Sequence, residues 1–558
     1  VTASSAQPEQ LAIVPSSASS ANPTDASEAG ATATGIDAGN AADVVITNTG
    51  TLEVHSSSDG SVAQVSALGI LSGNGKDVIF NDGVVNVTAE NIVDESSSTA
   101  SLTGGDDLTA TTILSTSATG IDSGNGGDII TNDGTVSAEA LTDLGAVNVE
   151  LNLIDTSHAD TSVSLYSNSI GVAGGNGKDI VDNTGSIEAN ATSRMDTVNV
   201  EVNGVDAGLA DSKNLLDSAA LALTTGSGND TIISSGSITA SATSELDEVS
   251  VNVSYADVTI ADRDGSDTST QLYSDATAID SGSGNDYLFL DSAANVDATA
   301  LSDVYSIGVS IASEGVPAST ESLFIDGSLA NVGLDSYSQT TGIVTGQGND
   351  DLVNLGSVTS EAIANSSQVG VNVGIALIDF VVPTPGLVLG GGGTSAQATS
   401  VGFDLGQGQD SVSNSGSLLV DADSTADSTI VSVNIAELSI GGIDGFPGLG
   451  AAVVAADTTT FADSTALGIS AGSGNDVVDN TGTMTVTAGA HGDSTSAAAG
   501  LGIQIGQDDD ALQIDAILAR AETQSTATSS GITGDDGHDQ INNSGTMTIA
   551  SEAETDAL

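Results

Sequence analysis

Apolar and polar residues alternate strictly in many short stretches of this chain. Thr483–Ala488 (TMTVTA) and Ser186–Ala191 (SIEANA) are two examples, and each places its apolar residues on one side of an extended backbone. Alternation with a period of two predicts β-strands that are buried on one face. Further alternating stretches, such as Val147–Leu153 and Val249–Ser254, predict additional strands between these.

These strands belong to a unit that recurs ten times. Each copy has a glycine-rich loop, typically Gly-x-Gly-x-Asp, then a short apolar strand, in most copies an Asn-x-Gly turn, and an alternating strand, as in residues 124–138. Successive loop aspartates are 34 residues apart at first and 51 to 66 residues apart thereafter. The loops end at Asp43, Asp77, Asp128, Asp179, Asp230, Asp286, Asp350, Asp410, Asp476 and Asp539.

Internal repetition of this kind is typical of solenoids. We therefore predict an all-β fold, an elongated parallel β-solenoid (β-helix) of about ten 51–66-residue repeats with inserted excursions. A period this long fits either two coils per repeat or one coil that carries a hairpin-like excursion. At ~4.8 Å per coil, the array is expected to be roughly 50–100 Å long.

The repeats divide the chain into three parts. Residues 1–30 form a low-complexity tail rich in Ala, Ser, Thr and Pro, residues 31–550 the repeat array, and residues 551–558 a C-terminal tail. We hypothesise that residues 11–15 of the first tail dock on a neighbouring subunit or cap the first coil. Two excursions, residues 369–393 and 440–456, are apolar and rich in glycine. Apolar excursions on a soluble surface indicate contact sites, although packing onto the solenoid itself also explains them.

Composition narrows the possible partners. The chain has 6 Lys and Arg against 75 Asp and Glu, a formal charge of −69, so nucleic acid is excluded and an anionic membrane surface would be repelled. There is no Cys, which excludes disulfides and thiolate metal sites. No apolar run is long enough to predict a membrane span. The chain begins with Val1 rather than Met, so we expect that an N-terminal signal was removed.

Stacked coils bring equivalent residues together. An Asn two positions before the turn glycine recurs in eight repeats, and stacked side-chain amides form a ladder of hydrogen bonds. Ser234 breaks this ladder, and the repeat of Asp286 lacks the Asn-x-Gly turn. The predicted ladder consists of Asn48, Asn81, Asn132, Asn183, Asn354, Asn414, Asn480 and Asn543.

Stacked aspartates repel one another. Two carboxylates ~4.8 Å apart cost about 3–4 kcal/mol at an effective dielectric near 20, and six basic residues cannot neutralise ten of them. A divalent cation held between coils by carboxylate and carbonyl oxygens removes this cost, and flexible oxygen ligands suit Ca²⁺ better than Mg²⁺. The alternative is that Gly and Asp only form tight turns here.

The loops also resemble a known calcium-binding motif. Gly-x-Gly-x-Asp-x-[Val/Ile], as in Gly124–Ile130, is similar to the core of the RTX nonapeptide, whose family binds Ca²⁺ between turns of a parallel β-roll. RTX motifs run in tandem, whereas this chain has one motif per repeat. The resemblance implies that the ten loop aspartates are calcium ligands. Some repeats carry one more carboxylate before the loop, which we add to the candidate ligands: Asp37, Asp122, Asp280 and Asp404.

The rest of the unit, Asn-x-Gly-[Thr/Ser]-[Val/Ile/Met]-x-[Val/Ala], resembles the β-helix repeats of large bacterial surface adhesins and autotransporter passengers. We expect a secreted, non-enzymatic structural protein, a calcium-stabilised β-solenoid that forms an extracellular filament, sheath or surface layer, such as a biofilm matrix. It would contact itself through the N-terminal tail and the excursions 369–393 and 440–456.

One other function remains open at this point. The chain could be an adhesin stalk, a binding module that presents its variable loops to a surface or glycan. An enzyme is not expected, because the four His residues share no register and the carboxylates single out no one cleft.

Overall fold

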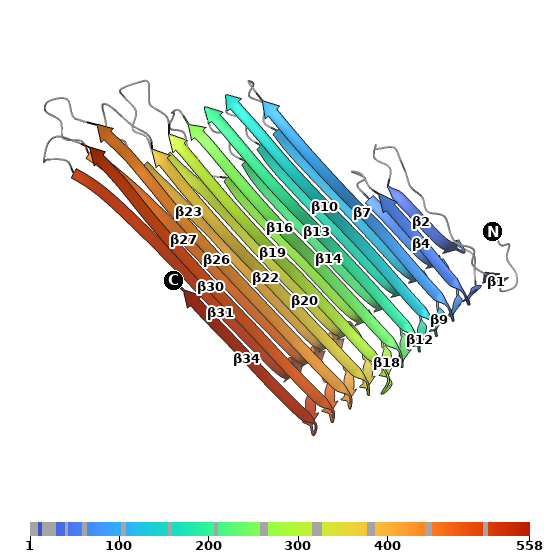
Figure 1. Cartoon of the computed structure of the whole chain (residues 1–558). Helices are drawn as coiled ribbons and strands as arrows, with labels where there is room; N and C mark the ends of the chain where they lie inside the picture. The colour runs from blue at the N-terminus through green and yellow to red at the C-terminus, as the bar shows by residue number, and fades with distance from the viewer. Residues whose placement is uncertain are drawn as a thin grey trace.

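The structure is a computed structural model. It describes residues 9–13, 30–39, 43–58, 64–101, 108–154, 159–205, 210–256, 266–314, 326–376, 386–440, 449–505 and 512–558. In these ranges the fold is an all-β parallel solenoid, as the alternation and the repeats predict. Ten coils stack side by side, and the N- and C-terminal ends of the chain lie at opposite ends of the stack (Figure 1).

Each coil contributes one strand to each of three parallel sheets. Sheet A is narrow and consists of β1 (Glu9–Ile13), β3 (Val44–Asn48), β6 (Val78–Asn81), β9 (Ile129–Asn132), β12 (Ile180–Asn183), β15 (Thr231–Ser234), β18 (Tyr287–Leu290), β21 (Asp351–Asn354), β25 (Ser411–Asn414), β29 (Val477–Asn480) and β33 (Gln540–Asn543).

Sheet B follows the Asn-x-Gly turns. It consists of β4 (Thr51–Ser58), β7 (Val84–Ser101), β10 (Thr135–Ile154), β13 (Ser186–Val205), β16 (Ser237–Ala256), β19 (Asn295–Glu314), β22 (Ser357–Ala376), β26 (Ser417–Ile440), β30 (Thr483–Ile505) and β34 (Thr546–Ala557).

Sheet C leads into the glycine loops. It consists of β2 (Ala31–Asp37), β5 (Gln64–Leu71), β8 (Leu108–Asp122), β11 (Ala159–Ala173), β14 (Ala210–Thr224), β17 (Ser266–Asp280), β20 (Asp326–Val344), β23 (Gly386–Asp404), β27 (Leu449–Ser470) and β31 (Leu512–Thr533). A fourth, short sheet joins the last three glycine loops through β24 (Gln407–Gly408), β28 (Ser473–Gly474) and β32 (Asp536–Gly537).

The register decides between the two coil arrangements that the sequence leaves open. Ile129 pairs with Ile180 and Ile180 with Thr231, so one repeat of 51 residues makes one coil. Sheets A, B and C together enclose a three-sided part of each coil. Beyond this part sheets B and C continue as two facing layers, so the excursions are not separate hairpins. A 20-residue strand spans about 66 Å, whereas ten coils stack to about 48 Å, the short end of the expected length.

The interior has two apolar clusters separated by hydroxyl groups. The larger cluster fills the three-sided part from the first coil to the ninth and includes Ile46, Ile130 and Val486. The smaller cluster lies between sheets B and C, and includes Leu144 and Leu216. Rows of buried Ser and Thr lie between the two clusters.

These hydroxyl rows hold sheet B against sheet C. Thr142 on β10 contacts Thr116 on β8 at 2.9 Å, and Ser193 on β13 donates to Ser167 on β11 at 3.1 Å. The same contact recurs further along the stack, where Ser464 on β27 donates to Ser424 on β26 at 2.8 Å. Since all these side chains are buried, the hydrogen bonds avoid the cost of leaving hydroxyl groups unpaired.

The two ends of the chain differ from the predicted division into tails and array. Residues 9–13 form β1, which pairs with β3 and covers the outer edge of the first coil in sheet A; residues 14 and 15 lie outside the described ranges. At the other end, β34 pairs with β30 as far as Ala557, so residues 551–557 belong to the last strand of sheet B rather than to a tail. The described parts of the excursions, residues 369–376, 386–393, 440 and 449–456, lie in strands of sheets B and C.

Candidate functional site

The glycine loops lie between sheets C and A, one above the other. In the third coil Gly124 has φ +82° and Gly126 has φ +152°, which are conformations that other residues rarely adopt. A Cβ on Gly124 would lie 1.8 Å from the carbonyl oxygen of Gly73 in the preceding coil. The glycines therefore serve both the turn and the close stacking of neighbouring loops.

The loop aspartates form a buried ladder from coil to coil. Oδ1 of Asp128 accepts the backbone N–H of Asp77 at 2.8 Å, and Oδ1 of Asp179 accepts that of Asp128 at 2.8 Å. The same bond recurs up to Oδ1 of Asp539, which accepts the N–H of Asp476 at 3.1 Å. In the first coil the N–H of Val44, not that of Asp43, donates to Asp77. Nine of the ten predicted aspartates thus share one role, and Asp43 does not.

The second carboxylate oxygen of this ladder has no partner. Eight loop aspartates are at most 3% exposed, and within the described residues no hydrogen bond reaches their Oδ2 atoms. Buried charges without partners are costly. Such a carboxylate either binds a cation or has a raised pKa and keeps its proton. The eight residues are Asp77, Asp128, Asp179, Asp230, Asp286, Asp350, Asp410 and Asp476.

Burial raises the pKa of most of these carboxyl groups. It brings the pKa of Asp179 and of Asp410 to about 7 and that of Asp286 to about 6, although the N–H bond from the preceding coil opposes the shift. The negative charges of neighbouring ladder members add to the increase in these three. The pKa of Asp128, Asp230, Asp350 and Asp476 is likewise raised, with burial as the largest cause.

In some coils a hydroxyl five positions before the aspartate opposes this effect. Hydroxyl groups of Ser123 and Thr225 lower the pKa of Asp128 and Asp230, respectively, against the effect of burial. Asp179 and Asp410, whose pKa values reach about 7, have Gly174 and Leu405 at this position. The hydroxyl of Ser123 donates to the carbonyl oxygen of Gly174 in the next coil at 2.8 Å.

The four additional carboxylates have a different, local role. Oδ1 of Asp122 accepts the N–H of Gly124 at 2.9 Å, and Oδ1 of Asp280 accepts that of Gly282 at 2.9 Å. Asp37 and Asp404 bond in the same way to Gly39 and Gly406. These bonds close the turn that begins the loop. Burial raises the pKa of Asp122 and Asp280 despite the bond.

The donor chemistry of the ladder fits a hard cation, but its geometry gives few ligands per position. The atoms present are carboxylate Oδ2, hydroxyl and carbonyl oxygens, which Ca²⁺ prefers. Among the described residues, however, no three Asp, Glu or His side chains converge on one point. Any ion here would depend on main-chain oxygens for much of its shell.

The predicted asparagine ladder is confirmed. The Nδ2 of Asn81 donates to Oδ1 of Asn132 at 2.7 Å, and the Nδ2 of Asn132 donates to Oδ1 of Asn183 at 2.8 Å. A second run begins with Asn354, which donates to Asn414 at 2.8 Å, and continues through Asn480 to Asn543. Asn183 donates instead to the hydroxyl of Ser234 at 3.2 Å, and Leu290 then interrupts the ladder.

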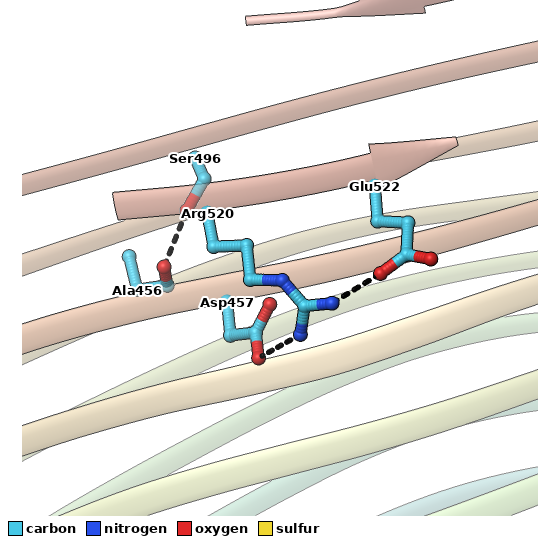
Figure 2. Close-up of polar contacts among 5 residues, drawn as sticks. All are labelled: Ala456, Asp457, Ser496, Arg520 and Glu522. Carbon is cyan, nitrogen blue, oxygen red and sulfur yellow. Dashed lines mark hydrogen bonds and ion pairs between the residues drawn. The ribbon is translucent and has the colours of Figure 1, made fainter. Parts of the chain in front are cut away.

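Ion pairs compensate little of the negative charge. Arg194 bonds Glu245 in the next coil at 2.6 Å, with both side chains partly exposed. In the last two coils Arg520 lies between Glu522 and Asp457, 3.5 Å from the Asp457 carboxylate (Figure 2). Solvent-exposed pairs of this kind contribute at most about 1 kcal/mol each, so they leave the aspartate ladder unneutralised.

A surface hollow of about 790 Å³ lies away from the glycine loops, on sheet B. None of the candidate ligands predicted from the sequence lines it. Its walls combine carboxylates with apolar side chains, because the small residues Gly145 and Ala146 leave room in the third coil. The residues lining it include Asp94, Asp196, Asp247, Glu248, Val198, Val249 and Tyr305.

Within its described ranges the chain has no helix of the length and hydrophobicity needed to span a membrane. No family model, no curated protein and no solved structure matches the chain.

Proposed function

We propose that this chain is a non-enzymatic structural protein of the extracellular space, whose coils stack end to end into a filament, sheath or surface layer. The proposal rests on one observation: successive coils repeat one cross-section, and the tenth coil repeats that of the ninth. Ile541 and Ile549 are 42% and 45% exposed, whereas their counterparts in the ninth coil, Val478 and Val486, are fully buried. Another coil of the same cross-section, whether of this chain or of a second copy, would cover them.

The ladders support the same proposal. Every coil bonds to the next through the same backbone, Asp and, in most places, Asn contacts, so the stack has no built-in limit. An open parallel edge is a template for a further strand, and a head-to-tail contact that does not close propagates. The first coil of a second copy is the surface with matching strand order.

Light scattering and electron microscopy of the purified chain test the assembly. We expect concentration-dependent fibrous or sheet-like particles, and expect Ile549→Lys to prevent them, because a charge on the open edge opposes strand addition. Leu419→Lys is the matched control, since Leu419 is 40% exposed but lies in the eighth coil, away from the edge. A chain that stays monomeric at all concentrations, or equal effects of the two lysines, would contradict the proposal.

We also propose calcium as the ion of the aspartate ladder. The eight unpartnered Oδ2 atoms support this, because their negative charge is otherwise uncompensated within the described residues. Far-UV circular dichroism is measured with a chelator and after addition of Ca²⁺ or Mg²⁺. We expect the β-signal to fall with the chelator and to recover with Ca²⁺ alone. An unchanged signal would show that the loops do without calcium.

A further inference from the structure

The outer face of sheet B has a broad aliphatic area on the half of the strands farthest from the glycine loops. The alternating stretches of β13, β16, β19, β22 and β26 point their Val and Ile side chains outward there, in register from coil to coil. This valine face consists of Val198, Val200, Val249, Val251, Ile307, Val309, Ile311, Val369, Val371, Val373, Val431 and Val433. All twelve are partly exposed, and Val198 is 38% exposed.

The opposite side of the same strands is mostly polar although it is buried, with Ile430 as an apolar exception. Between the outward valines, Glu248, Gln368 and Asn372 point inward toward sheet C and are at most 1% exposed. Figure 2 shows the same inward direction in the ninth coil, where Ser496 donates to the carbonyl oxygen of Ala456 on sheet C at 2.7 Å. The amides of Gln368 and Asn372 have no hydrogen-bond partner among the described residues. This half of sheet B therefore has its apolar side outside, the reverse of an ordinary solenoid wall.

We infer that the valine face is a contact surface for a second copy of this chain. Five strands ~4.8 Å apart, with three outward positions ~6.7 Å apart, cover roughly 500 Å². Two such faces bury about 1,000 Å², the lower limit for a specific interface. The face itself has no charged residue, so the −69 charge of each copy lies outside this contact. A second valine face matches it in size and in lack of charge.

An acidic band fixes the orientation of the pair. The positions just before the valine face carry Asp94, Asp143, Asp196, Glu245, Asp247, Asp303, Asp427 and Asp493. If the two-fold axis ran along the strands, the two bands would face each other. If it runs along the stacking direction, they lie about 33 Å apart, several Debye lengths at physiological salt. The second arrangement leaves both copies with the same coil direction.

This pairing deepens the proposed assembly, since it adds a lateral contact between parallel stacks, and its biological role rests on that proposal. The absence of Cys from the chain makes it directly testable by cross-linking. With the axis along the stack, Val251 of one copy faces Val251 of the other; with the axis along the strands, Val251 would face Val371. We therefore expect Val251→Cys alone to form disulfide-linked dimers on mild oxidation.

Val401→Cys is the control, because Val401 is partly exposed but lies on sheet C. Linkage only in mixtures of Val251→Cys and Val371→Cys would overturn the orientation. Equal linkage of Val251→Cys and Val401→Cys, or none, would overturn the contact itself.

Sedimentation velocity gives an independent measure. We expect a monomer–dimer equilibrium that is strengthened by salt, and at least a tenfold weaker dimer in Val251→Asp than in Val401→Asp. Both substitutions are made in the Ile549→Lys background, where end-to-end stacking is blocked. Dimers in that background without any long particles in the unmodified chain would sustain the pairing and refute the filament. Long particles of the unmodified chain, together with equal effects of Val251→Asp and Val401→Asp on the dimer, would sustain the filament and refute the pairing.

Discussion

At the scale of single residues, each ladder aspartate uses its two oxygens differently. Oδ1 of Asp179 accepts the N–H of Asp128, whereas its Oδ2 is buried without a partner. Burial accordingly raises the pKa of Asp179 and Asp410 to about 7, well above the ~3.9 of an aspartate in an unfolded chain. Between these pH values the folded chain keeps protons that the unfolded chain has lost. The free energy of unfolding therefore falls as the pH rises from about 4 to about 7.

The substitution Asp179→Asn separates this effect from the general loss of negative charge in acid. Its Oδ1 still accepts the N–H of Asp128, but no carboxylate has to be buried at neutral pH. In metal-free buffer we expect a higher urea midpoint than that of the unmodified chain at pH 7.5, and no gain at pH 4. Asp182→Asn, on the outer face of sheet A in the same coil, is the control. Its urea midpoint should equal that of the unmodified chain at both pH 7.5 and pH 4. A lower midpoint than that of the unmodified chain at pH 7.5 in this metal-free buffer would contradict the cost of burying the Asp179 carboxylate.

At the scale of the elements, the asparagine ladder joins the ends of most sheet A strands to the next coil. Asn132 accepts from Asn81 and donates to both Asn183 and the carbonyl oxygen of Ser186. Asn132→Ala removes these bonds, leaves Oδ1 of Asn183 without this donor, and leaves Nδ2 of Asn81 with only the carbonyl oxygen of Thr135. We expect a loss of roughly 2–4 kcal/mol in the free energy of unfolding, measured by urea denaturation.

A second, exposed ladder provides the control for that substitution. Asn125, in the glycine loop of the same coil, donates to Asn74 at 2.8 Å and accepts from Asn176 at 2.6 Å. Water replaces these bonds when they are lost, so Asn125→Ala should change the stability by less than about 0.5 kcal/mol. Similar losses for both alanines would show that burial does not govern the strength of the ladders.

The elements also show how far the sequence alone could lead. Alternation and repetition predict the strands, the parallel stacking and the asparagine ladder, because each is a local pattern that stacking repeats. The number of coils per repeat does not follow, since a period of 51 residues fits one long coil as well as two short ones. Nor do the buried hydroxyl rows. Thr142 and Ser193 read locally as ordinary polar positions, and only the facing of sheets B and C brings them to Thr116 and Ser167.

At the scale of the whole molecule, the two ends of the stack are unequal. Within the described residues the tenth coil is open, whereas β1 lies on the outer edge of β3 and gives sheet A one strand more than sheets B and C. This extra strand stands in the place where β33 of another copy would pair in an end-to-end stack. A covered edge of this kind restrains strand addition.

Deletion of residues 1–13 should therefore speed assembly. Without β1 the first coil presents all three of its strand edges, so a second copy can add without displacing a strand. We expect a shorter lag and a lower threshold concentration in light-scattering time courses, together with an unchanged β-signal. Replacing residues 1–8 alone with a Gly/Ser segment leaves β1 in place and should leave the time course unaltered. Loss of assembly on deletion of residues 1–13 would instead make β1 a joint between copies, the other role that the sequence suggests for this segment.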